Sequence, residues 1–129
     1  MSKFITALVT KDITDSIVEL VEPLVYYSDL LNCEICAPVG FQSDGASVPR
    51  LPIIYTLYGN RAHMESVLHD MLYRVDCPWD VTRIIADLIF FEAMTSRGKP
   101  AYIRYTMYEG VRLGGWASYK KLKMLDKLA

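Results

Sequence analysis

The 129-residue sequence has few groups from which a disulfide framework or a zinc site could be built. It holds three cysteines, an odd number in a chain without a visible leader, and this argues against a fold stapled by disulfides. Cys33 and Cys36 form a C-x-x-C, but no second pair at similar spacing accompanies them. We interpret them as small buried residues in a strand pair, with a zinc site as the alternative. The only histidines, His63 and His69, are six apart and fall on different faces of a helix, unlike the i, i+4 pair of a zinc protease.

Long apolar runs are also missing. The longest candidate, Ile84 to Met94, is interrupted by Asp87 and Glu92, so no window approaches the ~18–20 apolar residues of a membrane span. The apolar stretch at residues 4–9 is too short for the core of a signal peptide. We therefore expect no transmembrane segment and no signal peptide, and a protein that stays in the cytoplasm in which it is made.

The composition is that of a globular protein, with 52% apolar and 22% charged residues. The length corresponds to about one domain with a core of its own. We expect residues 1–129 to form a single domain that is β-rich over residues 1–50 and helical over residues 60–129.

Positive charge is concentrated at the C-terminal end. Residues 97–129 carry eight basic side chains against Glu109 and Asp126, although the whole chain has a net charge of −1. Such a segment, with aromatic residues interleaved, could face a phospholipid membrane or a nucleic acid, the latter being the weaker alternative. More often such a segment is a solvated face, or it docks on the acidic part of its own domain. The residues that would make the membrane contact are Trp116, Lys120, Lys121, Lys123 and Lys127.

Hydrophobic patterning predicts an α+β fold, with short N-terminal antiparallel strands followed by an antiparallel helix pair and C-terminal helices. The expected strands are Phe4–Val9, Ser16–Val25 and Leu30–Ala37. The expected helices cover residues 61–74, about 80–96, 101–113 and 116–128. The second of these is apolar nearly all round, which is typical of a central buried helix.

The first predicted helix carries His69 and Asp70. Tyr73 follows His69 by four residues and shares its face, whereas Asp70 points about 100° away. A histidine can act as a general base near neutral pH if a partner fixes its tautomer. The alternative is that His69 hydrogen-bonds a backbone carbonyl in the core while Asp70 pairs with Arg74.

The second predicted helix places an acid within an apolar stripe. Ile84, Asp87, Phe91 and Met94 follow a 3-4-3 spacing, and a buried carboxylate is costly unless it is paired. Arg83, four residues before Asp87, is one possible partner. The other is His69, which Asp87 would reach if the two helices pack antiparallel across their short turn.

A loop rich in turn residues precedes the helices. Asp44-Gly45 is typical of a turn, and Ser47-Val48-Pro49 gives the loop a rigid, extended exit. Gly45 lets the backbone approach a ligand closely, and oxygen ligands of this kind suit calcium. The alternative is a turn that only joins the sheet to the helix.

Three ordered motifs carry a family resemblance. They are Gly40-Phe41-x-x-Asp44-Gly45-Ala46-Ser47-Val48-Pro49-Arg50, then His69-Asp70-x-Leu72-Tyr73, then Arg83-x-x-Ala86-Asp87-x-x-Phe90-x-x-Ala93-Met94-x-x-x-Gly98. Over about residues 30–115 the chain resembles the bacteriophage-associated domain-of-unknown-function family 1353. This resemblance implies a phage or prophage protein, located in the host bacterial cytoplasm or carried in the virion.

A second likeness concerns the chemistry. The His69-Asp70-x-x-Tyr73 motif, between an Asp-Gly loop and a later aspartate, is similar to the motif of prokaryotic and fungal phospholipases A2. The likeness implies that His69 is the base, with Asp87 and Tyr73 orienting it. It also implies calcium as the cofactor, held by Asp70 and by the Asp44 loop. In that arrangement Gly45 belongs to the metal loop, and the supporting residues are Ser47, Pro49 and Arg83.

Two functions follow as hypotheses. The first is a His/Asp-dependent, calcium-assisted ester hydrolase of phospholipase A2 type. The second is a non-catalytic phage virion, tail or assembly protein that contacts other phage structural proteins, in which the same residues form a structural polar network.

Overall fold

A computed structural model describes residues 1–15, 17–43, 64–74, 79 and 81–114 of the chain. Within these ranges, short strands come first and helices follow, which confirms the predicted α+β class. The strands are β1 (Lys3–Phe4), β2 (Thr10–Asp12), β3 (Val18–Leu20), β4 (Leu24–Ser28), β5 (Cys33–Ala37) and β6 (Gln42–Ser43). The helices are α2 (Met64–Leu72), α3 (Arg83–Ser96) and α4 (Ala101–Gly114).

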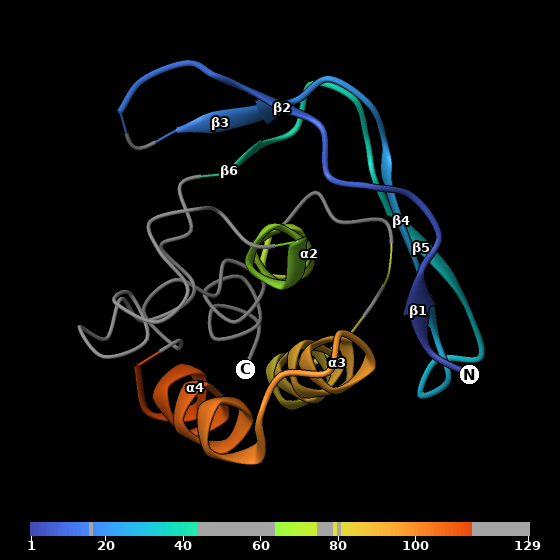
Figure 1. The fold of residues 1–129 in the computed structure, drawn as a ribbon, viewed down its shortest axis with the longest axis vertical. Coiled ribbons are helices and arrows are strands. Elements are labelled where there is room, and N and C mark those ends of the chain that lie inside the picture. The colour runs from blue at the N-terminus through green and yellow to red at the C-terminus, as the bar shows by residue number, and fades with distance from the viewer. Residues whose placement is uncertain (16, 44–63, 75–78, 80, 115–129) are drawn as a thin grey trace, which may run out of the picture.

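The strands form two small antiparallel sheets, with the orders β1-β4-β5 and β2-β3-β6. The β4–β5 hairpin is the most regular pair, running in register from Leu24 opposite Ala37 to Ser28 opposite Cys33. Figure 1 shows the two sheets along two sides of α2, with α3 and α4 on the side away from β2 and β3. The sheets therefore form part of the wall around α2.

The strands are shorter and more broken than the sequence predicted. Only Phe4 of the expected strand Phe4–Val9 lies in β1, and the expected strand Ser16–Val25 is divided between β3 and β4. The division falls at Pro23, which has no N–H to donate to a ladder. Thr6 stabilises this break, since its hydroxyl donates to the Pro23 carbonyl and accepts from the Val25 N–H, both at 3.0 Å.

The prediction for the C-x-x-C pair was right about the strand and wrong about burial. Cys33 and Cys36 lie in β5, paired with β4, but Cys33 is exposed and Cys36 only half-buried. The pleat explains why Cys36 is only half-buried, because alternate residues point to opposite faces and Ile35 and Ala37 take the core side.

The central buried helix is α2 rather than α3, which corrects the prediction. Seven of the nine residues of α2 are buried, because both sheets and α3 surround it. In α3, by contrast, Ile84 and Leu88 are exposed at 47% and 36%. Among the described residues, no helix is long and apolar enough to cross a membrane.

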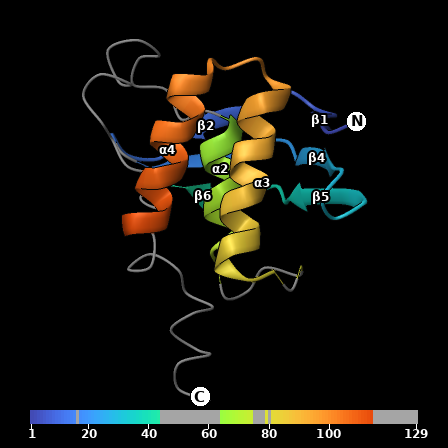
Figure 2. The ribbon, with the colours of Figure 1, turned by 90° about the horizontal axis from the view of Figure 1, so that it is seen from below.

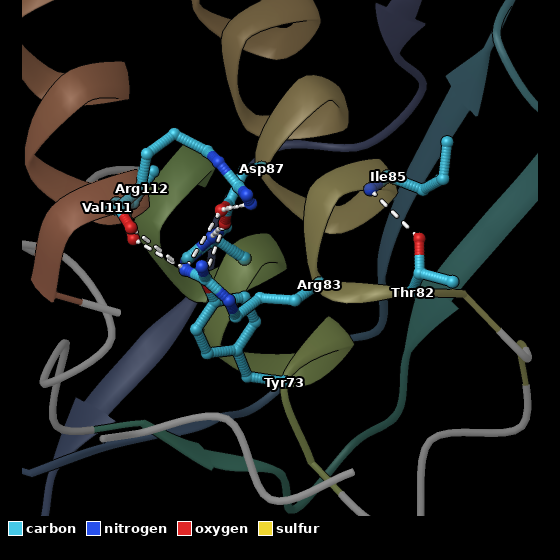
Figure 3. Close-up of polar contacts among 8 residues, drawn as sticks. Tyr73, Thr82, Arg83, Ile85, Asp87, Val111 and Arg112 are labelled. Carbon is cyan, nitrogen blue, oxygen red and sulfur yellow. Dashed lines mark hydrogen bonds and ion pairs between the residues drawn. The ribbon is translucent and has the colours of Figure 1, made fainter. Parts of the chain in front are cut away.

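The ends of α3 are fixed by local chemistry. Thr82 caps its N-terminus, its hydroxyl accepting from the Ile85 N–H at 3.3 Å (Figure 3). At the other end Gly98 has a φ of +74°, a left-handed conformation that glycine adopts without strain. The expected end at Ser96 is therefore confirmed, while the described helix starts at Arg83 rather than near residue 80.

The three helices run alternately up and down, as Figure 2 shows. The beginning of α2 lies against the end of α3, since Glu65 accepts from Arg97 at 2.7 Å and from Lys99. The beginning of α3 lies against the end of α4, since Arg83 donates to the Val111 carbonyl at 3.1 Å. The predicted antiparallel helix pair is confirmed, and α4 continues the pattern.

We expect the buried Glu65 carboxylate to be a strong determinant of stability. Glu65→Gln removes the negative charge that Arg97 and Lys99 share, and breaking a largely buried ion pair costs about 3 kcal/mol. The measurement is the free energy of unfolding in urea. The matched control is Glu34→Gln in β5, an exposed glutamate, which should change it by less than about 0.5 kcal/mol. Equal, small effects of the two substitutions would contradict the expectation.

Candidate functional site

His69 and Asp87 meet across the α2–α3 pair, which is one of the two partnerships that the sequence offered for Asp87. The Nε2 atom of His69 lies 2.7 Å from Oδ1 of Asp87, and both side chains are fully buried. An ionised carboxylate accepts from Nε2–H, and in the neutral imidazole this tautomer leaves the lone pair on Nδ1. Asp87 therefore fixes both the orientation and the tautomer of the ring.

Tyr73 completes the cluster from just beyond the end of α2. Its N–H donates to the His69 carbonyl at 3.1 Å, which continues the helical path and keeps Tyr73 on the face of His69. Its hydroxyl donates to the same Oδ1 of Asp87, at 2.5 Å. The His69 ring also packs against two aromatic rings, with centroids 4.1 Å from Tyr73 and 4.9 Å from Phe90. The imidazole is thus held by packing as well as by the hydrogen bond.

Two arginines approach the other carboxylate oxygen. Arg112 of α4 donates to Oδ2 of Asp87 at 2.8 Å, and Arg83 of α3 lies 3.6 Å from the same atom. Arg83 also donates to the carbonyls of Val111 and Arg112, which belong to the last turn of α4. Figure 3 shows both guanidinium groups converging on Asp87, with Tyr73 nearby. The expected i, i+4 pairing of Arg83 with Asp87 is present, in addition to the contact with His69.

The surroundings keep Asp87 ionised. Burial raises the pKa of the Asp87 carboxyl, but the hydrogen bonds from His69, Tyr73 and Arg112 outweigh burial and bring that pKa below its usual value. Burial, and then the hydrogen bond to Asp87, raise the pKa of Tyr73 far above its usual value. Tyr73 therefore stays protonated near neutral pH and donates to Asp87.

Asp70, the expected calcium ligand, lies on α2 next to His69 and is 6% exposed. The expected alternative partner, Arg74, instead donates to the Gln42 carbonyl at 3.0 Å and lies over the Phe41 ring. Within the part of the chain that the structure describes, no three His, Cys, Asp or Glu side chains lie together as a metal site. Of the residues that the sequence assigned to calcium, Asp70 is therefore the one carboxylate that the structure describes.

Several predicted site residues lie outside the described residues. The loop members are Asp44, Gly45, Ser47 and Pro49, and the proposed membrane contacts are Trp116, Lys120, Lys121, Lys123 and Lys127. Their roles stay predictions.

Sequence reasoning missed two charged residues that the structure makes prominent. Glu65 precedes the buried Leu68 and Leu72 by three and seven residues, so the helical period could have placed it on the core side. Arg112 had no such signal, because its contact with Asp87 depends on how α4 folds back over α3.

We expect Asp87 to contribute to the loss of stability in acid. Because its pKa is lowered in the folded state from a reference of 3.8, its contribution is fully present above about pH 4 and is lost as the pH falls toward the folded value. Urea unfolding from pH 6 to pH 2 should show a shallower acid loss in Asp87→Asn than in wild type. Glu34→Gln, at an exposed carboxylate of β5, is the control and should follow wild type closely. An unchanged pH dependence in Asp87→Asn would contradict the expectation.

Comparison with known proteins gives one family. A family model described as "Protein of unknown function (DUF1353)" matches residues 18–111, which include His69, Tyr73, Asp87 and Val111. No significant match is found among curated proteins or among solved structures. The match begins earlier than the resemblance at about residue 30 suggested, so it takes in β3 to β6 as well as α2, α3 and most of α4. Since it spans well over half of the chain, this protein belongs to the DUF1353 family.

Proposed function

We propose that this protein is a His/Asp-dependent ester hydrolase, in which His69 acts as the general base. The observation that carries the proposal is the 2.7 Å contact between Nε2 of His69 and Oδ1 of Asp87, together with the Tyr73 hydroxyl on the same oxygen. A histidine whose tautomer is fixed by a buried carboxylate, itself held by further groups, follows the logic of the hydrolase triads.

In the proposed reaction, Nδ1 of His69 takes a proton from water, and the oxygen of that water attacks the ester carbonyl. Asp87 keeps the imidazole in position and stabilises the imidazolium that forms. Tyr73 donates to the same oxygen of Asp87 that faces His69 and so helps to hold that oxygen toward the ring. The imidazolium then returns its proton to the departing alkoxide. Because His69 is fully buried, admission of an ester requires the protein to open beside the ring.

Calcium is compatible with the proposal, because carboxylate oxygens are ligands that calcium prefers. Asp70 is the described carboxylate that would hold it, next to His69 on α2, and the resemblance to phospholipases A2 assigns the remaining ligands to the loop of Asp44 and Gly45. When bound, calcium would supply positive charge for the oxygen of the ester carbonyl. A phospholipid is the proposed substrate, on the same resemblance.

A second candidate is a non-catalytic phage virion, tail or assembly protein. The observation in its favour is that the His69 side chain is fully buried and that both oxygens of Asp87 are already engaged. The network would then hold α2, α3 and α4 together. The exposed apolar side chains of Ile84, Leu88 and Tyr105 would offer a surface to other phage structural proteins.

The deciding experiment is a phospholipid and short-chain ester hydrolysis assay with calcium or with chelator. We expect activity in wild type that falls about 100- to 10,000-fold in His69→Gln, the contribution of a general base. The chelator should lower the wild-type activity and leave the residual activity of the variant unchanged.

Thermal unfolding of both proteins checks that His69→Gln is folded. Glu34→Gln, an exposed change in β5, serves as the matched surface control and should keep wild-type activity. Background hydrolysis by all of these proteins, with and without calcium, would exclude the hydrolase proposal and leave the second candidate function.

A further inference from the structure

We infer that Arg112 is a positioning residue of the site, which fixes the Asp87 carboxylate from the side opposite to His69. The effect of Arg112 on catalysis rests on the proposed function. Its effect on the position of Asp87 rests on geometry alone. It makes α4 part of the site, although His69, Tyr73 and Asp87 all come from α2, its end and α3.

The first argument is that different groups bind the two carboxylate oxygens of Asp87. Oδ1 of Asp87 receives His69 and Tyr73, at 2.7 and 2.5 Å, and Oδ2 receives Arg112 at 2.8 Å. A carboxylate held at one oxygen can still rotate about its bond to the chain. Donors on both oxygens stop that rotation, and a charge-assisted bond is the stronger kind.

The second argument is that Arg112 is itself held in place. Arg83 donates to the Arg112 carbonyl at 3.2 Å and to the Val111 carbonyl at 3.1 Å, so the last turn of α4 is tied to the first turn of α3. These are carbonyls that a helix end leaves without a partner inside the helix. Arg83 thus orients the backbone of Arg112, whose side chain then orients Asp87 (Figure 3).

Arg112 is the better candidate of the two arginines. Its Nη1 is within hydrogen-bond distance of Oδ2, while Arg83 lies at 3.6 Å and its Nη1 is shared between two carbonyls. The Arg112 side chain is also 30% exposed, so its charge is not trapped in the interior. A substitution there removes one partner of Asp87 without leaving a buried cavity.

The structural test is the proton on Nε2 of His69. A strongly hydrogen-bonded imidazole N–H gives a separate downfield signal in the proton NMR spectrum, assigned here by its absence in His69→Gln. We expect wild type to show it, Arg112→Gln to lose or broaden it, and Arg112→Lys to recover it in part. The matched control is Arg104→Gln, because Arg104 lies on the same helix but contacts Thr95, Lys99 and Phe91 instead.

The catalytic test uses the same variants. We expect Arg112→Gln to lower kcat about tenfold to a hundredfold with KM little changed, and Arg104→Gln to change neither. In an Asp87→Ala background the Arg112→Gln substitution should have no further effect, because both carboxylate oxygens are gone.

The outcomes separate the two proposals. A downfield signal unchanged in a folded Arg112→Gln, with wild-type kcat, overturns the inference about Arg112. If wild type hydrolyses nothing, the proposed function fails and the NMR signal alone decides the inference. If Arg112→Gln does not fold, Arg112→Lys decides, because lysine keeps the positive charge but loses the paired N–H donors of the guanidinium group. A downfield signal in Arg112→Lys that equals the wild-type signal would then overturn the inference.

Discussion

The structure depends on one ionised carboxylate placed where water does not reach. Asp87 is fully buried, and an isolated charge in that position would cost several kcal/mol. The cost is offset because α2 supplies His69, the residue after α2 supplies Tyr73, and α4 supplies Arg112. Each of these partners lowers that cost, so the packing of the helices and the ionisation of Asp87 depend on each other.

A second buried carboxylate joins the two helices at the opposite end of the helix pair. Glu65 begins α2 and meets Arg97 and Lys99 just past the end of α3. With Asp87 near the start of α3 and Tyr73 just beyond α2, the two antiparallel helices are joined by charged groups at both ends. Apolar packing between them, such as Leu68 and Leu72 against the core, is compatible with small sliding, whereas two separated ion clusters fix one register.

The same constraint bears on both candidate functions. A hydrolase needs an imidazole whose orientation is fixed before substrate arrives, and a network with partners on both carboxylate oxygens provides that. A structural protein needs three helices held in one arrangement, and the network provides that too. What separates them is whether Nδ1 of His69 can meet a substrate. This depends on whether the protein opens beside the ring, because the His69 side chain is fully buried and packs against Tyr73 and Phe90.

The sequence by itself determined the α+β class and the end of α3 just before Gly98, and it offered His69 as one of two partners for Asp87. These follow from local rules: the helical period, the left-handed freedom of glycine, and the need of a buried acid for a partner on the neighbouring helix. Tertiary structure alone decided that α2 is the central helix, since burial depends on what surrounds an element and not on how apolar it is. It also decided that Arg112 belongs to the site, because 25 residues of chain separate it from Asp87 and only the return of α4 over α3 brings them together.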